Sequence, residues 1–227
     1  MKRIYFLHGF MGTGQTHFEP QLTYFKTDYD VILLDLPGHG ASETDAVADY
    51  IDQATDYVLE QMKKTGPGYL VGLSLGASLS LQIALQAPTL VAGVVLTGYT
   101  PDVPEELTDI MAQQYTYFLE IDQHQPDVAE QFAALHGNRW KTTMQHVLYQ
   151  MTFRYPVMTK ETLADLTIPL HILNGTDQAY EVDGASRLQK DYPATEIDLI
   201  ADAGHTANLD QPESFNKRLE QILSRSY

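Results

Sequence analysis

The sequence from residue 72 to residue 76 reads GLSLG, which is the pattern G-x-S-x-G between an apolar run and a helix-like segment. Glycines on both sides of the serine let a strand and the helix that follows it approach closely, so the chain can turn sharply. Such a turn lifts the serine hydroxyl above the end of the strand, beside the positive end of the helix. Ser74 is therefore our candidate for a catalytic nucleophile.

A serine nucleophile requires a base that takes its proton and an acid that orients the base. Two later apolar runs are each followed by a loop with a suitable residue, Asp177 in the first and His205 in the second. Because the carboxyl ends of parallel strands meet at one edge of a sheet, these side chains should lie near Ser74. We expect His205 to be the base and Asp177 the acid, with Asp202 as the alternative acid.

The elements that must hold these residues alternate along the chain. Short apolar runs predict strands at residues 4–7, 31–35, 69–73, 93–97, 170–174 and 196–200. The first five runs are almost continuously apolar, as in parallel strands that are covered on both faces. Helix-like segments lie at about 44–64, 75–87, 182–191 and 211–224. The alternation predicts an α/β fold with a doubly wound, mostly parallel sheet of about six strands and flanking helices.

Residues 100–166 break this alternation, because they contain no strand-like run and are rich in aromatic residues and methionine. Ile110, Gln114, Tyr117 and Ile121 follow helical spacing. We expect a helical cap insertion over the end of the sheet, and a core formed by residues 1–99 and 167–227. For most of the aromatic side chains the simplest interpretation is packing between helices, although an apolar roof over a pocket would use the same residues.

Composition narrows the class of protein. A chain of 227 residues suits one domain with a modest insertion. It carries 14 basic and 30 acidic residues, a formal net charge of −16, which argues against nucleic acid and membranes as partners. It has no cysteine, which excludes disulfides and thiolate catalysis. The first apolar run ends at His8, too early for a secretory signal, so we expect a cytoplasmic protein. A homo-oligomer is compatible with the sequence.

A nucleotide-binding alternative arises from the segment between Gly9 and Thr16, which differs by one residue from the phosphate-binding loop G-x-x-x-x-G-K-[ST]. The differing residue is Gln15, where that loop needs the lysine that reaches the phosphates. The later segments VILLDLPG and NGTD match nucleotide-site motifs only in part, and NGTD lacks the lysine that guanine recognition requires. Each match fails at its charged centre, so the sequence argues against phosphate chemistry.

The segments HGF, DLPGHGAS, GLSLGAS, NGTD and AGHTANLDQPESF occur in an order that resembles the α/β-hydrolase superfamily across nearly the whole chain. The resemblance is to the serine-nucleophile, esterase-like branch with a helical cap. It implies a nucleophile elbow at Ser74, a catalytic triad with His205 and Asp177, and an oxyanion hole made by the N–H groups of Phe10 and Leu75. Members of the superfamily usually begin with an antiparallel hairpin, which we expect to be missing here.

We expect the other histidines to have roles other than that of the catalytic base. His8 and His39 lie beside the motifs HGF and PGHG, and we expect structural roles for both, with His8 shaping the oxyanion loop. The cap histidines 124, 136 and 146 have no spacing that indicates metal ligands, so we expect them to be packed or solvated.

The resemblance implies a carboxylesterase that acts on a small-molecule ester with a small to medium acyl group, through an acyl-enzyme, without a cofactor or a metal. Serine at position 74, where some similar folds use aspartate, argues against haloalkane dehalogenase and epoxide hydrolase chemistry. An alternative within the superfamily is a carbon–carbon bond hydrolase, or a lyase like the SHCHC synthase of menaquinone biosynthesis. A third interpretation is a non-catalytic ligand-binding protein with the same fold.

The carbon–carbon alternative makes a demand that the sequence meets only in part. The substrates of such enzymes are anionic and call for basic side chains near the site. The best-known synthases carry an arginine shortly after the elbow, whereas this chain continues GASLSLQIAL without one. Arg139, Lys141 and Arg154 in the cap remain as candidates for that role.

Overall fold

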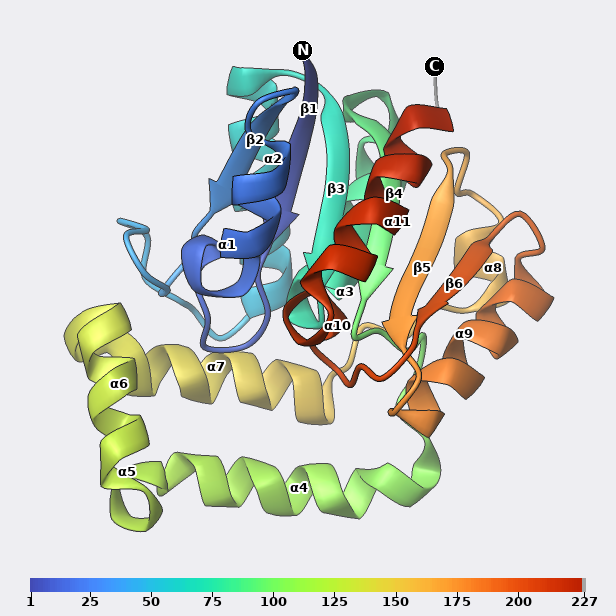
Figure 1. The fold of residues 1–227 in the computed structure, drawn as a ribbon. Helices are drawn as coiled ribbons and strands as arrows, with labels where there is room; N and C mark the ends of the chain where they lie inside the picture. Colours follow the sequence, from blue (N-terminus) through green and yellow to red (C-terminus); the bar gives the residue numbers. More distant parts are fainter. Residues whose placement is uncertain (226–227) are drawn as a thin grey trace.

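The computed structural model describes residues 1–225 and contains one sheet of six parallel strands in the order β2-β1-β3-β4-β5-β6 (Figure 1). The strands are β1 (Lys2–Leu7), β2 (Tyr29–Leu34), β3 (Gly68–Leu73), β4 (Val91–Thr97), β5 (Leu170–Gly175) and β6 (Glu196–Ile200). Each run predicted as a strand corresponds to one of them, and only the run 31–35 extends past its strand, by one residue. The predicted doubly wound, six-stranded fold is therefore confirmed, and within residues 1–225 the sheet has no antiparallel strand.

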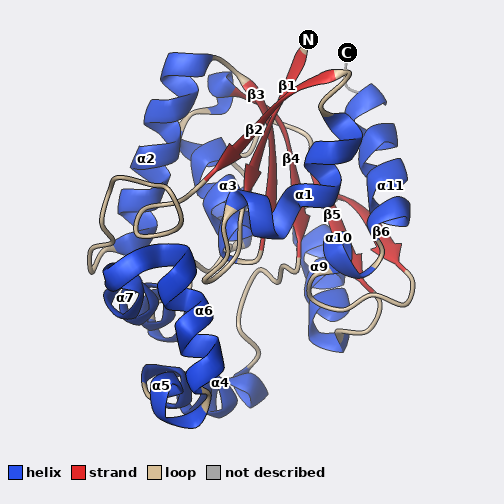
Figure 2. Ribbon diagram, turned by 60° about the vertical axis from the view of Figure 1, so that its left-hand side comes forward, coloured by secondary structure: helices blue, strands red, loops and turns tan. Residues whose placement is uncertain are grey.

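Helices cover both faces of the sheet (Figure 2). The elements α1 (Gly14–Phe25) and α11 (Pro212–Arg225) pack on one face, and α2 (Tyr50–Thr65), α3 (Leu75–Gln86) and α9 (Ala179–Asp191) pack on the other. Side chains of a strand alternate between the two layers: in β1, Phe6 belongs to the layer of α1 and α11, and Tyr5 to the layer of α2 and α3. The sheet is thus buried on both sides, as its apolar runs predicted.

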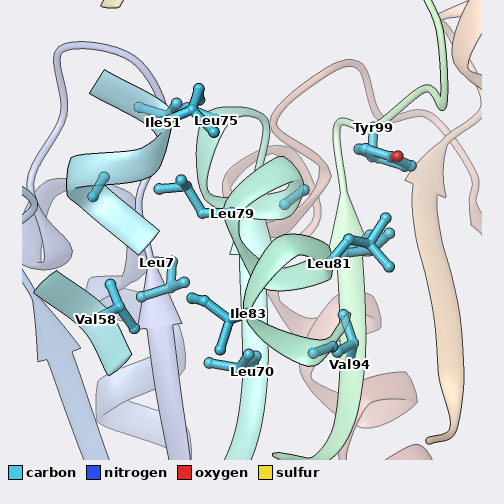
Figure 3. Close-up of a cluster of buried hydrophobic side chains, with 14 of the residues drawn as sticks. Leu7, Ile51, Val58, Leu70, Leu75, Leu79, Leu81, Ile83, Val94 and Tyr99 are labelled. Carbon is cyan, nitrogen blue, oxygen red and sulfur yellow. The ribbon is translucent and has the colours of Figure 1, made fainter. Parts of the chain in front are cut away.

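The central helix α3 is buried along most of its length. Figure 3 shows Leu79, Leu81 and Ile83 of α3 in the apolar cluster that also holds Val58 of α2 and Leu70 of β3. Close packing of this kind leaves a helix little freedom to shift. The beginning of α3, and the turn that leads into it from β3, are therefore held firmly in place.

A layer of helices between β4 and β5 lies at the carboxyl ends of the strands, at the bottom of Figure 1. It consists of α4 (Glu105–Leu119), α5 (Ile121–His124), α6 (Pro126–His136) and α7 (Trp140–Phe153). The short helix α8 (Lys160–Leu163) follows in the chain and lies beside α9 (Figure 1). The helix α7 carries buried residues, whereas α4 packs on α7 and has no fully buried residue. We propose that residues 100–166 form the cap. The remaining short elements are η1 (Pro88–Leu90), η2 (Gly137–Arg139) and α10 (Ala207–Asp210).

Helices α1 and α2 are among those that differ from the sequence-based prediction. Helix α1 was not predicted, and it is irregular, with Pro20 inside it and a non-helical conformation at Phe18 (φ −135°, ψ 21°). Its start is held by a reciprocal pair of hydrogen bonds between Thr13 and Thr16. Helix α2 begins at Tyr50, later than the predicted start near residue 44. In both places glycine, proline or short polar residues weaken the helical pattern.

The part of the chain that the structure describes, residues 1–225, includes no helix with both the length and the apolar character needed to cross a membrane.

Candidate active site

Ser74 occupies the sharp turn between β3 and α3. Its backbone has φ 54° and ψ −111°, a left-handed conformation that is costly for a residue with a side chain. A Cβ atom at Gly72 would collide with the backbone of Gly76, and one at Gly76 would collide with the carbonyl of Leu7. Only glycine fits at these two positions. The turn therefore presents Ser74 at the carboxyl end of a central strand, as the G-x-S-x-G pattern predicted.

His205 follows β6, and its partner is Glu181. The Nδ1 atom of His205 lies 2.5 Å from Oε1 of Glu181. The Glu181 side chain is 1% exposed, whereas that of His205 is 41% exposed. Because a carboxylate oxygen accepts, Nδ1 carries the hydrogen, and Nε2 of the neutral ring is left with a lone pair that can take a proton. This pair has the arrangement of a general base with its orienting acid.

The prediction of Asp177 as the partner of His205 is corrected by this geometry. Asp177 lies in the loop after β5, its N–H donates to the carbonyl of Ala203, and its exposed carboxylate accepts a hydrogen bond from the Thr176 hydroxyl at 3.0 Å. Asp202, the alternative acid, is also exposed and lies in a turn with φ 54°. Glu181 reaches His205 instead because it projects from the first turn of α9, on the buried side of that helix.

Glu181 accepts a second hydrogen bond at the same oxygen. The hydroxyl of Tyr180 donates to Oε1 at 3.1 Å. Burial, and then the charge of Glu181, raise the pKa of the Tyr180 hydroxyl well above its usual value, so Tyr180 stays a donor. The side chain of Asn174 at the end of β5 also donates to the backbone carbonyl of Glu181, at 3.3 Å. The acid is therefore held through both its side chain and its backbone.

The two N–H groups predicted to form an oxyanion hole lie in the same region. Leu75 is the first residue of α3, where a backbone N–H has no acceptor within its own helix. Phe10 lies in the loop after β1, and like Leu75 it lines the pocket that contains Ser74. Among the described residues, neither N–H donates to a backbone carbonyl or a side chain. Both donors are thus available to a bound group.

A cavity of about 470 Å³ connects these groups. Ser74, Glu181 and His205 line it. The cap contributes to its wall the apolar side chains Val103, Leu107, Met111, Phe118, Leu148 and Met151. No lysine or arginine is among the described residues that line the cavity. Its charge and polarity suit an uncharged, largely apolar group.

The three cap cations that the sequence left as candidates are engaged elsewhere. Their acidic partners are Asp45 for Arg139, Asp122 for Lys141 and Asp49 for Arg154. Arg139 also donates to the carbonyls of Gly40 and Ser42. None of the three lines the cavity. In residues 1–225, no group of three or more histidine, aspartate or glutamate side chains is arranged to hold a metal ion.

Two histidines, the buried His8 and the half-buried His17, support the loop after β1. His8 donates from Nδ1 to the carbonyl of Gly9 at 2.8 Å and accepts at Nε2 from the N–H of Leu36 at 3.0 Å, which is the structural role predicted for it. His17 in α1 accepts at Nδ1 from the N–H of Gly9 at 3.0 Å. Sequence reasoning missed His17 because it lies in the helix that was not predicted. Burial lowers the pKa of His8 to about 3 and that of His17 to about 4.

These shifts predict a loss of stability in mild acid. Below pH 6.5 the unfolded chain binds protons at His8 and His17 that the folded chain does not bind until pH 4 to 3. The free energy of unfolding should therefore be greatest above pH 6.5 and fall as the pH falls, with each histidine approaching about 1.4 kcal/mol per pH unit. Urea denaturation at pH 7.0, 5.5 and 4.5 measures this slope. A His17→Phe variant should show a shallower slope, and an unchanged slope in that variant would contradict the assignment.

A family model described as "Alpha/beta hydrolase family" matches residues 4–218. The chain therefore belongs to the alpha/beta hydrolase family, as the motifs predicted. A curated relative, the 2-succinyl-6-hydroxy-2,4-cyclohexadiene-1-carboxylate (SHCHC) synthase of Escherichia coli O17:K52:H18, is 27% identical over 245 residues that cover 97% of this chain and 93% of the relative.

Two solved structures show how far the similarity extends. The crystal structure of NosK from Streptomyces actuosus is 32% identical and superposes with a TM-score of 0.91, covering 99% of this chain and 98% of NosK. The 2-hydroxy-6-oxo-6-phenylhexa-2,4-dienoate hydrolase of Rhodococcus sp. strain RHA1 is 18% identical, with a TM-score of 0.79 over 98% of this chain and 90% of that one. The second similarity is one of fold alone.

Proposed function

We propose that this chain is a serine hydrolase in which Ser74 is the nucleophile, His205 the base and Glu181 the acid. The substrate is a carboxylic ester with an apolar acyl group of small to medium size. The observation that carries the proposal is a single cavity that holds Ser74, the hydrogen-bonded pair of His205 and Glu181, and two unpaired N–H groups. These are the parts that acyl transfer requires.

The proposed reaction has two stages. In the first, Oγ of Ser74 attacks the ester carbonyl while Nε2 of His205 takes the hydroxyl proton; the alcohol then leaves with that proton, and the acyl group stays on Ser74. In the second, His205 takes a proton from water as the water oxygen attacks the acyl carbonyl; the bond from that carbon to Oγ of Ser74 then breaks, Oγ takes the proton back from His205, and the carboxylic acid is released. Glu181 stabilises the imidazolium in both stages. The N–H groups of Phe10 and Leu75 stabilise the negative oxygen that forms in each.

The preference for an uncharged acyl group rests on the cavity wall. An anionic substrate needs a cation or several hydrogen-bond donors to replace the water that it loses on binding. The apolar side chains of α4 and α7 and the engaged cap cations provide no such cation. An alkyl or aryl acyl group would instead gain free energy by leaving water for this wall.

A second candidate function is favoured by the curated relatives. They are named as SHCHC synthases and match nearly the whole chain at 26–27% identity. A lyase or carbon–carbon hydrolase of this type would use the same serine and histidine on a different bond. Against it stands the absence of lysine and arginine from the described cavity wall. The names of the relatives and the chemistry of the cavity thus support different substrates, and an assay must decide between them.

The deciding experiment compares substrates on one enzyme preparation. The wild-type protein is assayed with p-nitrophenyl esters from acetate to octanoate and, separately, with the substrate of the SHCHC synthase. It is also incubated with an alkyl phosphonate, and the modified peptide is identified by mass spectrometry. We expect turnover of short or medium esters and a covalent adduct on Ser74.

Each other result has a definite meaning. Conversion of the synthase substrate without ester turnover would establish the second candidate in place of the first. No turnover and no adduct on Ser74 would reject both, and would leave the third interpretation from the sequence, a ligand-binding protein with the hydrolase fold.

A further inference from the structure

The loop that carries the Phe10 N–H is held on both sides by histidines. On one side, the N–H of Gly9 donates to Nδ1 of His17, at 3.0 Å. On the other, Nε2 of His136 donates to the carbonyl of Met11, at 3.1 Å. His17 comes from α1 in the core, whereas His136 is the last residue of α6 in the cap. The peptide groups His8–Gly9 and Met11–Gly12, which lie one step outside the two peptide groups of Phe10, are therefore held by side chains from different parts of the chain.

The conformation of this loop needs such support. Met11 has φ 49°, a left-handed conformation that is costly for a residue other than glycine. The N–H of Gly12 closes a turn onto the carbonyl of Gly9 at 3.3 Å. A Cβ atom at Gly12 would overlap the ring of His17, so this ring lies directly against the backbone of the turn. A strained turn of this kind persists only where its surroundings specify it.

His136 connects the loop to the cap. Its side chain is buried, with the residue 2% exposed. Nδ1 accepts from the N–H of Gly40 at 3.0 Å, so the hydrogen of the neutral ring is on Nε2, where it meets the carbonyl of Met11. The Met11 side chain packs in the cap cluster that includes Trp140 and Met144. The position of the cap and the position of this loop are therefore linked.

We propose that His17 and His136 are positioning residues of the oxyanion hole, which hold the Phe10 N–H toward the substrate carbonyl and make its position depend on the cap. The inference rests on the proposed function, because a negative oxygen forms only if Ser74 attacks a carbonyl. Neither histidine lines the cavity, so each acts through the loop and not on the substrate. A misplaced catalytic donor loses much of its effect, and removal of one donor costs about 10²- to 10³-fold in kcat.

The test uses pairs of variants that separate the hydrogen bond from the bulk of the ring. His17→Phe keeps a ring against Gly12 but loses the acceptor, whereas His17→Asn keeps an acceptor near the position of Nδ1. His136→Phe and His136→Gln form the corresponding pair for the donor to Met11. His124→Phe is the control, since the His124 ring stacks on Tyr117 in the cap, away from the loop.

We expect the phenylalanine variants to weaken stabilisation of the transition state much more than substrate binding. Both phenylalanine variants should lower kcat for the best p-nitrophenyl ester by about 10- to 100-fold, with KM changed by less than about threefold. The affinity for a trifluoromethyl ketone, which forms a tetrahedral adduct, should fall in parallel. His17→Asn and His136→Gln should restore most of the loss. A kcat within twofold of wild type in both phenylalanine variants, or an equal loss in all four variants, would overturn the proposal.

A second measurement separates this inference from the proposed function. If the wild-type protein hydrolyses no ester, the proposed function fails. The effect of His17 and His136 on the conformation of the loop around Phe10 is then tested by NMR. The Phe10 amide resonance should then shift in both phenylalanine variants but not in His124→Phe. Hydrogen exchange at the Gly9 amide, which donates to His17, should accelerate in His17→Phe. An unchanged Phe10 amide would overturn the role of the two histidines whether or not the enzyme is active.

Discussion

Ser74→Ala should lower kcat for p-nitrophenyl esters by about 10⁴- to 10⁶-fold, because loss of the nucleophile removes the acyl-enzyme route. The remaining rate would come from the oxyanion hole and substrate binding. The substitution keeps the Cβ atom, and no hydrogen bond of the Ser74 hydroxyl to another described residue is lost. The fold and the elbow should therefore survive, and the melting temperature should stay close to that of the wild type.

The measurement is kcat and KM for the preferred ester, with thermal unfolding recorded for the same preparations. Ser80→Ala is the matched control, since Ser80 lies in the same helix and its hydroxyl bonds only to the carbonyl of Gly76 among the described residues. Its activity should stay within a few-fold of wild type. If Ser74→Ala retained a tenth of the wild-type rate, the measured hydrolysis would not come from the proposed mechanism.

Glu181→Gln should reduce kcat by about 10⁴-fold, the size of the effect of an amide in place of the acid of a triad. The amide has no negative charge to stabilise the imidazolium of His205. If its NH₂ group faces Nδ1, the ring takes the tautomer that leaves no lone pair for the proton of Ser74. Asp177→Asn, by contrast, should leave kcat within about threefold, because the Asp177 carboxylate is exposed and bonded to Thr176.

Both variants are compared in the same ester assay, with circular dichroism to establish that they are folded. Glu181→Asp adds a graded case, since it keeps the charge and shortens the side chain by one methylene. It should fall between wild type and Glu181→Gln. A larger loss for Asp177→Asn than for Glu181→Gln would reinstate Asp177 as the acid and would require the loop after β5 to rearrange when substrate binds.

The fold was predictable because its strands are nearly continuous apolar runs separated by helical patterns. A parallel sheet buried on both faces demands such runs, and all six could be recognised. The helix α1 escaped prediction for the opposite reason. Its glycine-rich start and Pro20 weaken the local signal, and packing of Phe18 and Phe25 against the sheet compensates for it. The stability of such a helix depends more on its tertiary contacts than on the helix propensity of its own sequence.

The positions of Ser74 and His205 in the candidate site were predictable, because each lies in the segment that follows a strand. Ser74 is fixed by its flanking glycines, and His205 by the loop after β6. Glu181 escaped because its helix begins at Ala179, three residues before the predicted start at residue 182. One signal was available: Glu181 lies at helical spacing with Gly184, Ala185 and Leu188 on the buried face of α9. A carboxylate in an apolar stripe is unusual and calls for a partner.

The outer position of α4 has an evolutionary consequence. This helix supplies Leu107, Met111 and Phe118 to the cavity wall but contributes no fully buried residue to the protein. Substitutions of the α4 residues that line the cavity therefore cost little folding free energy, although they change the shape of the wall that contacts the substrate. The sheet and the proposed triad of Ser74, His205 and Glu181 form the part in which substitutions should cost most. Selection for new substrates can proceed through α4 with few compensating changes elsewhere.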